Sequence, residues 1–134
     1  GDMVLPRVST SGSVFDIGPQ GNPLALYLES LGRYETMAPD TLVLPSHGKP
    51  FRGVRTRIGQ LRDHHEARLA EVRAACAEKP HSAADIVPLM FKRQLDIHQL
   101  TFAMGEALAH LHVLWLEGEL KRQFDSDGVI RFSA

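Results

Sequence analysis

Residues 54–78 constrain the fold most, because their apolar side chains recur at the spacing of one long amphipathic helix. The residues near its apolar side are Val54, Ile58, Leu61, Leu69, Val72 and Cys76. Arginine and glutamate occupy other positions of this helix, and Pro80 stops it. The sequence therefore predicts a mainly helical chain.

A shorter helix is predicted over residues 22–37, with Asn22 as its cap and Pro23 in its first turn. Residues 41–44 then form a compact β-favouring run. The proline- and glycine-containing segment 46–50 follows that run directly, so we expect an exposed turn there. This arrangement presents a histidine at the end of a strand.

Two more helices are expected after the long one. Ser82 and Asp85 form a capping-box pattern at the start of a short helix, whose middle contains Pro88. Residues 100–117 carry apolar side chains at helical spacing, and Gly118 ends that helix.

Residues 120–124 and 129–132 read as two strands around Asp125-Ser126-Asp127-Gly128, a pattern typical of a β-hairpin. Three helices followed by a hairpin predict a winged-helix-like domain over residues 52–134. The preceding residues 1–51 are expected to form a separate unit.

Composition excludes several classes of protein. An apolar fraction of 43% with 23% charged residues rules out a disordered or low-complexity chain. Fifteen basic and sixteen acidic residues give a formal charge of −1, which removes any global attraction to nucleic acid or an anionic membrane. We expect no membrane partner, because no apolar run is long enough to cross a bilayer. The single Cys76 excludes an intrachain disulfide framework and favours a cytoplasmic location.

Most of the seven histidines do not have the spacing of a metal site. His110 and His112 are two residues apart, and roughly 200° of helical rotation separates them. Glu106 and His110, four residues apart, favour a structural ion pair or hydrogen bond over a metal site. His47 differs, because an exposed turn projects it from the backbone; it suits either a catalytic ligand or a histidine that caps its own turn.

Two segments carry a resemblance to a known family. Gly1-Asp2-Met3-Val4-Leu5-Pro6 and Thr41-Leu42-Val43-Leu44-Pro45-Ser46-His47-Gly48 resemble, in the same order, two late motifs of the metallo-β-lactamase superfamily. Downstream, Ala107-Leu108-Ala109-His110-Leu111, Trp115-Leu116-Glu117-Gly118 and the hairpin are similar to the winged-helix extension of one branch of these hydrolases. The resemblance covers nearly the whole chain.

This resemblance implies an α+β, mainly helical chain, in which residues 1–51 are the remnant of an αββα catalytic sandwich and residues 52–134 the winged-helix-like domain. It also implies that Asp2 bridges two metal ions, usually zinc, and that His47 ligates one of them. Ser46 stands where the second motif more often has glycine, which affects the turn geometry.

The family's principal metal motif, a closely spaced group of two histidines, an aspartate and a further histidine, does not occur in this sequence. We expect this motif upstream of Asp2, because the chain begins with Gly-Asp and not with methionine. The resemblance implies a parent hydrolase that cleaves a small-molecule ester, thioester or phosphodiester with metal-activated water. With at most two ligands and no assigned catalytic residue, the isolated chain is expected to be inactive.

A basic run that includes Lys49 and Arg52 follows His47. In a complete enzyme these two side chains would bind an anionic substrate, although a solvated, charge-rich helix start explains the same run. We do not expect nucleic acid as a partner of the winged-helix-like domain, because residues 100–117 contain no lysine or arginine. The alternative function is a non-enzymatic interaction or dimerisation module, and homo-oligomers are expected in either case.

Overall fold

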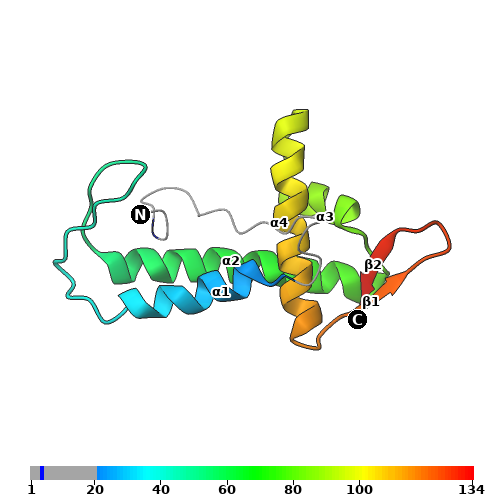
Figure 1. Cartoon of the computed structure of the whole chain (residues 1–134), viewed down its shortest axis with the longest axis horizontal. Helices are drawn as coiled ribbons and strands as arrows, with labels where there is room; N and C mark the ends of the chain where they lie inside the picture. Colours follow the sequence, from blue (N-terminus) through cyan, green and yellow to red (C-terminus); the bar gives the residue numbers. More distant parts are fainter. Residues whose placement is uncertain (1–3, 5–20) are drawn as a thin grey trace.

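The computed structural model describes Val4 and residues 21–134. Helices dominate this part of the chain, as the sequence predicts (Figure 1). In chain order the elements are α1 (Pro23–Leu31), the 3₁₀ helix η1 (Gly32–Tyr34), α2 (Val54–Glu78), α3 (Ala83–Met90), α4 (Ile97–Leu116), β1 (Lys121–Phe124) and β2 (Ile130–Ser133).

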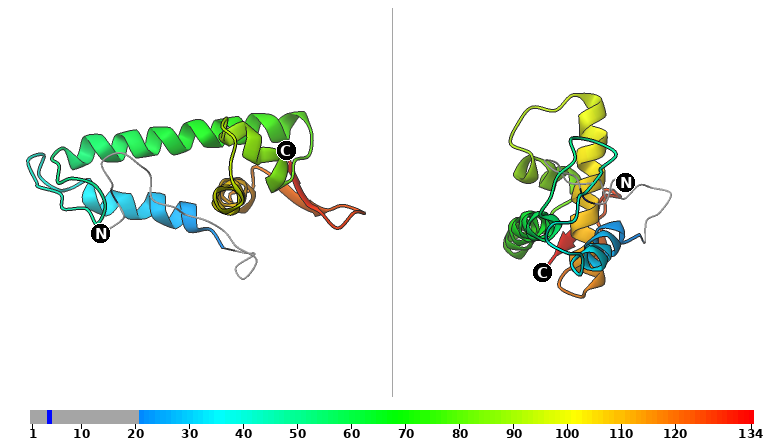
Figure 2. Two further views of the ribbon diagram at one scale, coloured as in Figure 1. Left: turned by 90° about the horizontal axis from the view of Figure 1, so that it is seen from above. Right: turned by 90° about the vertical axis from the view of Figure 1, so that its left-hand side faces the viewer.

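The long helix α2 is the axis of the structure. Helix α1 runs beside it in the opposite direction, and the loop that joins them lies at one end of the pair (Figures 1 and 2). Towards the other end of α2, helix α4 crosses the pair steeply, with α3 and the hairpin beyond it. The N-terminal end of α4 therefore projects past the body of the molecule (Figure 1).

One hydrophobic core joins the helices and the hairpin. The largest fully buried apolar side chains in it are Phe132, Leu24, Leu31, Ile58, Leu61, Ile86, Leu111 and Leu114. Each is worth about 1.5–3 kcal/mol of burial, so tertiary packing holds these helices in place. In the part of the chain that the structure describes, no helix has the length and apolar character that spanning a bilayer would require.

Helix α2 has the predicted bounds, whereas α1 is shorter than predicted. The α-helix stops at Leu31, and Gly32 starts a single 3₁₀ turn. Glycine is a poor helix former, so the tighter turn replaces the last α-helical residues. Pro23 occupies the first turn as predicted, but Asn22 makes no side-chain capping bond.

The predicted strand over residues 41–44 is not formed. Only an isolated bridge joins Val43 to Phe51, with backbone hydrogen bonds of 2.8 and 3.1 Å in the two directions. Leu42 and Leu44 are exposed on either side of it. β-Propensity cannot supply a partner strand, and no described residue outside this bridge pairs with the run.

Side-chain caps fix the starts of α3 and α4. The Ser82 hydroxyl accepts a hydrogen bond from the Asp85 amide at 3.2 Å, and the reciprocal bond is 2.9 Å long, which confirms the predicted capping box. Asp96 and Gln99 form a second box, with bonds of 2.7 and 3.1 Å. This box starts α4 at Ile97, three residues before the predicted position.

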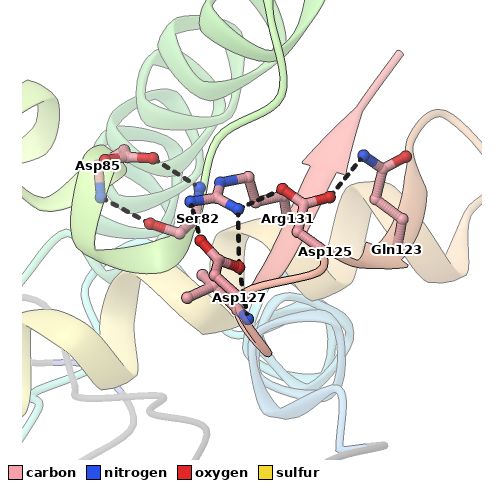
Figure 3. A network of polar contacts seen from close by, with 7 residues as sticks. Ser82, Asp85, Gln123, Asp125, Asp127 and Arg131 are labelled. Atoms are coloured by element: carbon pink, nitrogen blue, oxygen red, sulfur yellow. Dashed lines mark hydrogen bonds and ion pairs between the residues drawn. The ribbon is translucent and has the colours of Figure 1, made fainter.

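The predicted hairpin is present, with Phe124 paired to Ile130 and Lys121 to Ser133. Gly128 adopts a positive φ of 78°, a conformation that glycine accepts at low cost. Across the turn, Arg131 donates to both Asp125 and Asp127, while Gln123 donates to Asp125 from the neighbouring strand (Figure 3). The turn is therefore closed by side chains as well as by backbone.

The hairpin is also attached to the helices. Phe132 is fully buried, and its backbone exchanges hydrogen bonds of 3.0 and 2.9 Å with His81, between α2 and α3. The Ala134 amide donates to the Cys76 carbonyl at 3.1 Å. Three helices and a hairpin thus follow in the predicted order, while the winged-helix name and the boundary between residues 51 and 52 stay predictions.

Candidate functional site

His47 lies in the loop between η1 and α2, at the end of the α1/α2 pair remote from α4. Its side chain is exposed, and Gly48 next to it takes a left-handed φ of 89°. The Val43–Phe51 bridge closes this loop at its base. The structure thus presents His47 on a bridged turn, not at the end of a strand.

Asp2, the other predicted metal ligand, falls outside the described residues. Within Val4 and 21–134, no three His, Cys, Asp or Glu side chains are grouped so that they could hold an ion. The described residues therefore do not complete a metal centre around His47.

Both predicted substrate-binding residues, Lys49 and Arg52, are exposed on the loop that carries His47. The Arg52 guanidinium donates a hydrogen bond to the Asp40 carbonyl, and Arg55 Nε donates to the Met37 carbonyl at 3.1 Å. Arg52 and Arg55 therefore hold the segment before His47 against the start of α2. A guanidinium has five N–H donors, so Arg52 keeps donors for a ligand.

A pair of buried histidines lies where α2 and α4 cross. His65 Nδ1 and His110 Nε2 are 3.5 Å apart, and each side chain is only 2% exposed. His110 Nδ1 donates to the Glu106 carbonyl at 2.7 Å, which leaves His110 Nε2 as the acceptor of the pair. His65 then donates through Nδ1, so its Nε2 carries a lone pair, and no described residue donates to that atom.

The surroundings keep both imidazoles neutral. Burial, followed by the neighbouring His110 and His64, lowers the pKa of His65 to about 4. Burial also lowers the pKa of His110, against the opposing effect of its hydrogen bond to Glu106. The chain of donors from His65 to the Glu106 carbonyl therefore persists at neutral pH.

The other helix histidine, His112, is structural. Its Nδ1 is 2.9 Å from the Gly21 carbonyl, and its ring contacts Trp115 and Phe132. For His110, a structural hydrogen bond was predicted, and the structure confirms it, although its acceptor is the Glu106 backbone carbonyl.

Sequence reasoning missed the His65–His110 pair, because 45 residues separate its members. Helical spacing alone could have predicted that these two histidines are buried. Both histidines lie four residues from a position on the apolar side of their own helix, Leu61 for His65 and Leu114 for His110, so both were candidates for the core.

Comparison with protein families gives a match for the C-terminal half of the chain. Residues 69–134 match the family described as "Metallo-beta-lactamase-like, C-terminal domain". This match covers the C-terminal part of α2 and every later element, including the hairpin.

Individual proteins are similar along almost the whole chain. The Bacillus subtilis (strain 168) protein named "Probable metallo-hydrolase YqjP" is 29% identical over 133 residues. The crystal structure of a β-lactamase domain protein from Burkholderia ambifaria is 77% identical, with a TM-score of 0.97 over 98% of this chain. A metallo-β-lactamase family protein from Thermus thermophilus is 29% identical, with a TM-score of 0.80 over 99% of this chain.

These relatives are much longer than the chain. The chain spans 41% of the Bacillus protein, 39% of the Burkholderia structure and 40% of the Thermus structure. The likeness therefore concerns about two fifths of each relative.

Proposed function

Residues 69–134 form a metallo-β-lactamase-like C-terminal domain, and from this premise we propose that the chain is the C-terminal part of a metal-dependent hydrolase. The relative from Bacillus is named a metallo-hydrolase, and its similarity extends over 96% of this chain, upstream of the matched domain as well. This similarity is the main support for the proposal.

His47 and Asp2 are the metal ligands that we propose for this chain. An exposed imidazole on a turn closed by a backbone bridge is well placed to meet an ion bound by other parts of a protein. Zinc is the proposed metal, because imidazole nitrogen and carboxylate oxygen are among its usual ligands. The described residues do not hold an ion by themselves, so we derive no hydrolytic step from them and propose that the isolated chain is inactive.

We propose that Lys49 and Arg52 contact the anionic part of an ester, thioester or phosphodiester substrate. Both are exposed on the loop of His47, and Arg52 is oriented by its bond to the Asp40 carbonyl. Orientation in advance lowers the entropy lost when a guanidinium binds an anion.

Replacing His47 tests the proposal. In the full-length protein we expect His47→Ala to lower both the zinc content and turnover of a panel of aryl ester, thioester and phosphodiester probes, the latter by at least about a hundredfold. His98→Ala, which removes an exposed helix histidine, is the matched control.

Equal zinc content and turnover in the His47→Ala and His98→Ala proteins would contradict the assignment of His47. A full-length protein that binds no metal and cleaves none of the probes would contradict the hydrolase itself. For the isolated chain, calorimetry that finds two zinc ions bound with submicromolar affinity would refute its proposed inactivity.

A second candidate, a dimerisation module, is favoured by exposed apolar side chains. Leu26 and Leu44 are each 67% exposed, and Leu42 is 49% exposed. Burial is worth about 25 cal/mol per Å², so a patch of several hundred Å² supports a dimer in the micromolar range. We expect light scattering of the chain at about 100 μM to find a dimer, and Leu26→Lys with Leu44→Lys to give monomers; a wild-type monomer would exclude this candidate.

A cytoplasmic location accompanies both proposals. Cys76 is a free and buried thiol, which suits a compartment that keeps cysteines reduced.

A further inference from the structure

The turn of the C-terminal hairpin contains a dipeptide that is chemically unstable in flexible chains. Asp127 is followed by Gly128, and this is the one Asp-Gly step in the sequence. In such a step the backbone nitrogen of the glycine attacks the side-chain carbonyl carbon of the aspartate, because no Cβ on the glycine hinders the approach. No role proposed above uses this turn.

The reaction needs only these two residues and water. A bond forms between Gly128 N and Asp127 Cγ, and the neutral carboxyl group loses its hydroxyl, which leaves as water with the hydrogen of the amide. Water then opens the resulting succinimide ring at either carbonyl, and the product is aspartate or isoaspartate. The reaction therefore requires a carboxyl group in its neutral form and an amide N–H that is able to react.

The structure keeps the Asp127 carboxyl group ionised. Arg131 donates to both of its oxygens, from Nη1 to Oδ1 at 3.3 Å and from Nη2 to Oδ2 at 3.1 Å (Figure 3). The Val129 amide donates to Oδ1 at 3.0 Å. The bond from Arg131, followed by that from Val129, lowers the pKa of Asp127. A carboxylate held in this way is rarely the neutral acid that can lose its hydroxyl.

The turn also binds the attacking amide. The Gly128 N–H donates to the Asp125 carbonyl at 2.9 Å, and Arg131 in turn donates to the Asp125 side chain. One guanidinium thus holds both the carboxyl group that would react and the residue that accepts from the attacking amide. Burial cannot supply the same protection, because the Asp127 side chain is 52% exposed and water reaches it.

We propose that Asp127–Gly128 is a site of spontaneous isomerisation to isoaspartate, and that Arg131 suppresses the reaction in the folded protein. Isomerisation adds one carbon to the main chain of a turn whose two strands are paired in register. It also converts the carboxyl group that Arg131 binds into a main-chain carbonyl. The isomerised hairpin therefore loses the bonds that close its turn. The proposal does not depend on the hydrolase function.

Ageing the full-length protein at neutral pH, below its unfolding temperature, tests the proposal. Mass spectrometry with electron-transfer fragmentation distinguishes isoaspartate from aspartate at residue 127, and a synthetic peptide of residues 121–131 gives the rate without the fold. We expect the wild-type protein to isomerise at least about tenfold more slowly than the peptide, and Arg131→Gln at least about fivefold faster than the wild type. Lys121→Gln removes an exposed cation from the same hairpin and should leave the rate unchanged.

Further variants separate the chemical role of Arg131 from a loss of structure. Hydrogen exchange of the Phe132 amide, which donates to the His81 carbonyl, shows whether the hairpin stays docked in each variant. If Arg131→Gln loses this protection, Arg131→Lys takes its place, since lysine keeps the charge without the planar fork. Asp127→Glu combined with Arg131→Gln should abolish isomerisation at residue 127, because the longer side chain closes its ring far more slowly.

Three results would overturn the proposal. Isoaspartate that forms in the folded wild-type protein as fast as in the peptide would show that the hairpin gives no protection. Equal rates in the Arg131 variant and in Lys121→Gln, with the Phe132 amide protected in both, would remove Arg131 from the suppression. A peptide that forms no isoaspartate at residue 127 would refute the site itself.

Discussion

The loop around His47 and the crossing of α2 and α4 both contain histidines, but the histidine of the loop is exposed and those of the crossing are buried. His47 is exposed on a turn held by one bridge and two arginine contacts to backbone carbonyls. At the crossing, His65 and His110 are buried, neutral and bonded in series. The role that we propose for the loop depends on parts of a protein outside the described residues, whereas the crossing is stabilised by this chain's own core.

Truncating one side chain in each region should give the largest difference between the two regions, measured as a loss of the free energy of unfolding. Leu111→Ala removes a fully buried side chain from α4, and we expect it to lower the free energy of unfolding by about 3 kcal/mol. Leu44→Ala, in the exposed loop, should change it by less than about 0.5 kcal/mol. Urea denaturation measures both, and similar losses would mean that the loop is part of the cooperative core.

Lowering the pH should reduce the stability that comes from the crossing of α2 and α4. Unfolded His65 takes up a proton near its ordinary pKa of 6.5, while the folded residue resists protonation until about pH 4. The unfolded state therefore binds more protons in this window, so stability is complete above pH 6.5 and decreases as the pH falls towards 4.

We expect His65→Gln to flatten this part of the stability profile, and His98→Gln to leave it unchanged. Denaturant midpoints measured at intervals between pH 7 and 4 provide the comparison. A wild-type profile without any slope in this range would show that His65 is not held neutral by the fold.

The smallest effect concerns the helix that carries His110. Asp96→Ala removes the cap of α4 and should cost about 1 kcal/mol, because the Gln99 amide loses its acceptor. Thr101→Ala, also exposed on α4, should cost less, since its hydroxyl bonds only to the Ile97 carbonyl within the helix. Urea denaturation of the two variants would contradict the capping role if both lost the same stability.

Local patterns predicted local structure well. Helix α2 follows from an apolar period that only His65 interrupts, α3 from the Ser82–Asp85 box and the hairpin from its Asp-Gly turn. Residues 41–44 show the limit of such patterns, because a strand exists only with a partner, and propensity does not identify one.

The candidate sites were predicted less completely. His47 could be proposed as a candidate because its turn is local, but nothing local joins His65 to His110, which come from helices that cross only in the folded chain. The cap at Asp96 was a readable signal, an aspartate three residues before a glutamine, that apolar periodicity alone did not reveal.

The attachment of Phe132 to His81 has a consequence for the order of folding. The two residues lie about fifty positions apart, so α2 and α3 are synthesised well before the strand that seals their junction. At a ribosomal rate of about 5–20 residues per second, this junction stays open for seconds while α4 and the hairpin are made. Contacts of such long range slow folding, and we expect hairpin docking to be the slow step that commits the nascent chain to its native topology.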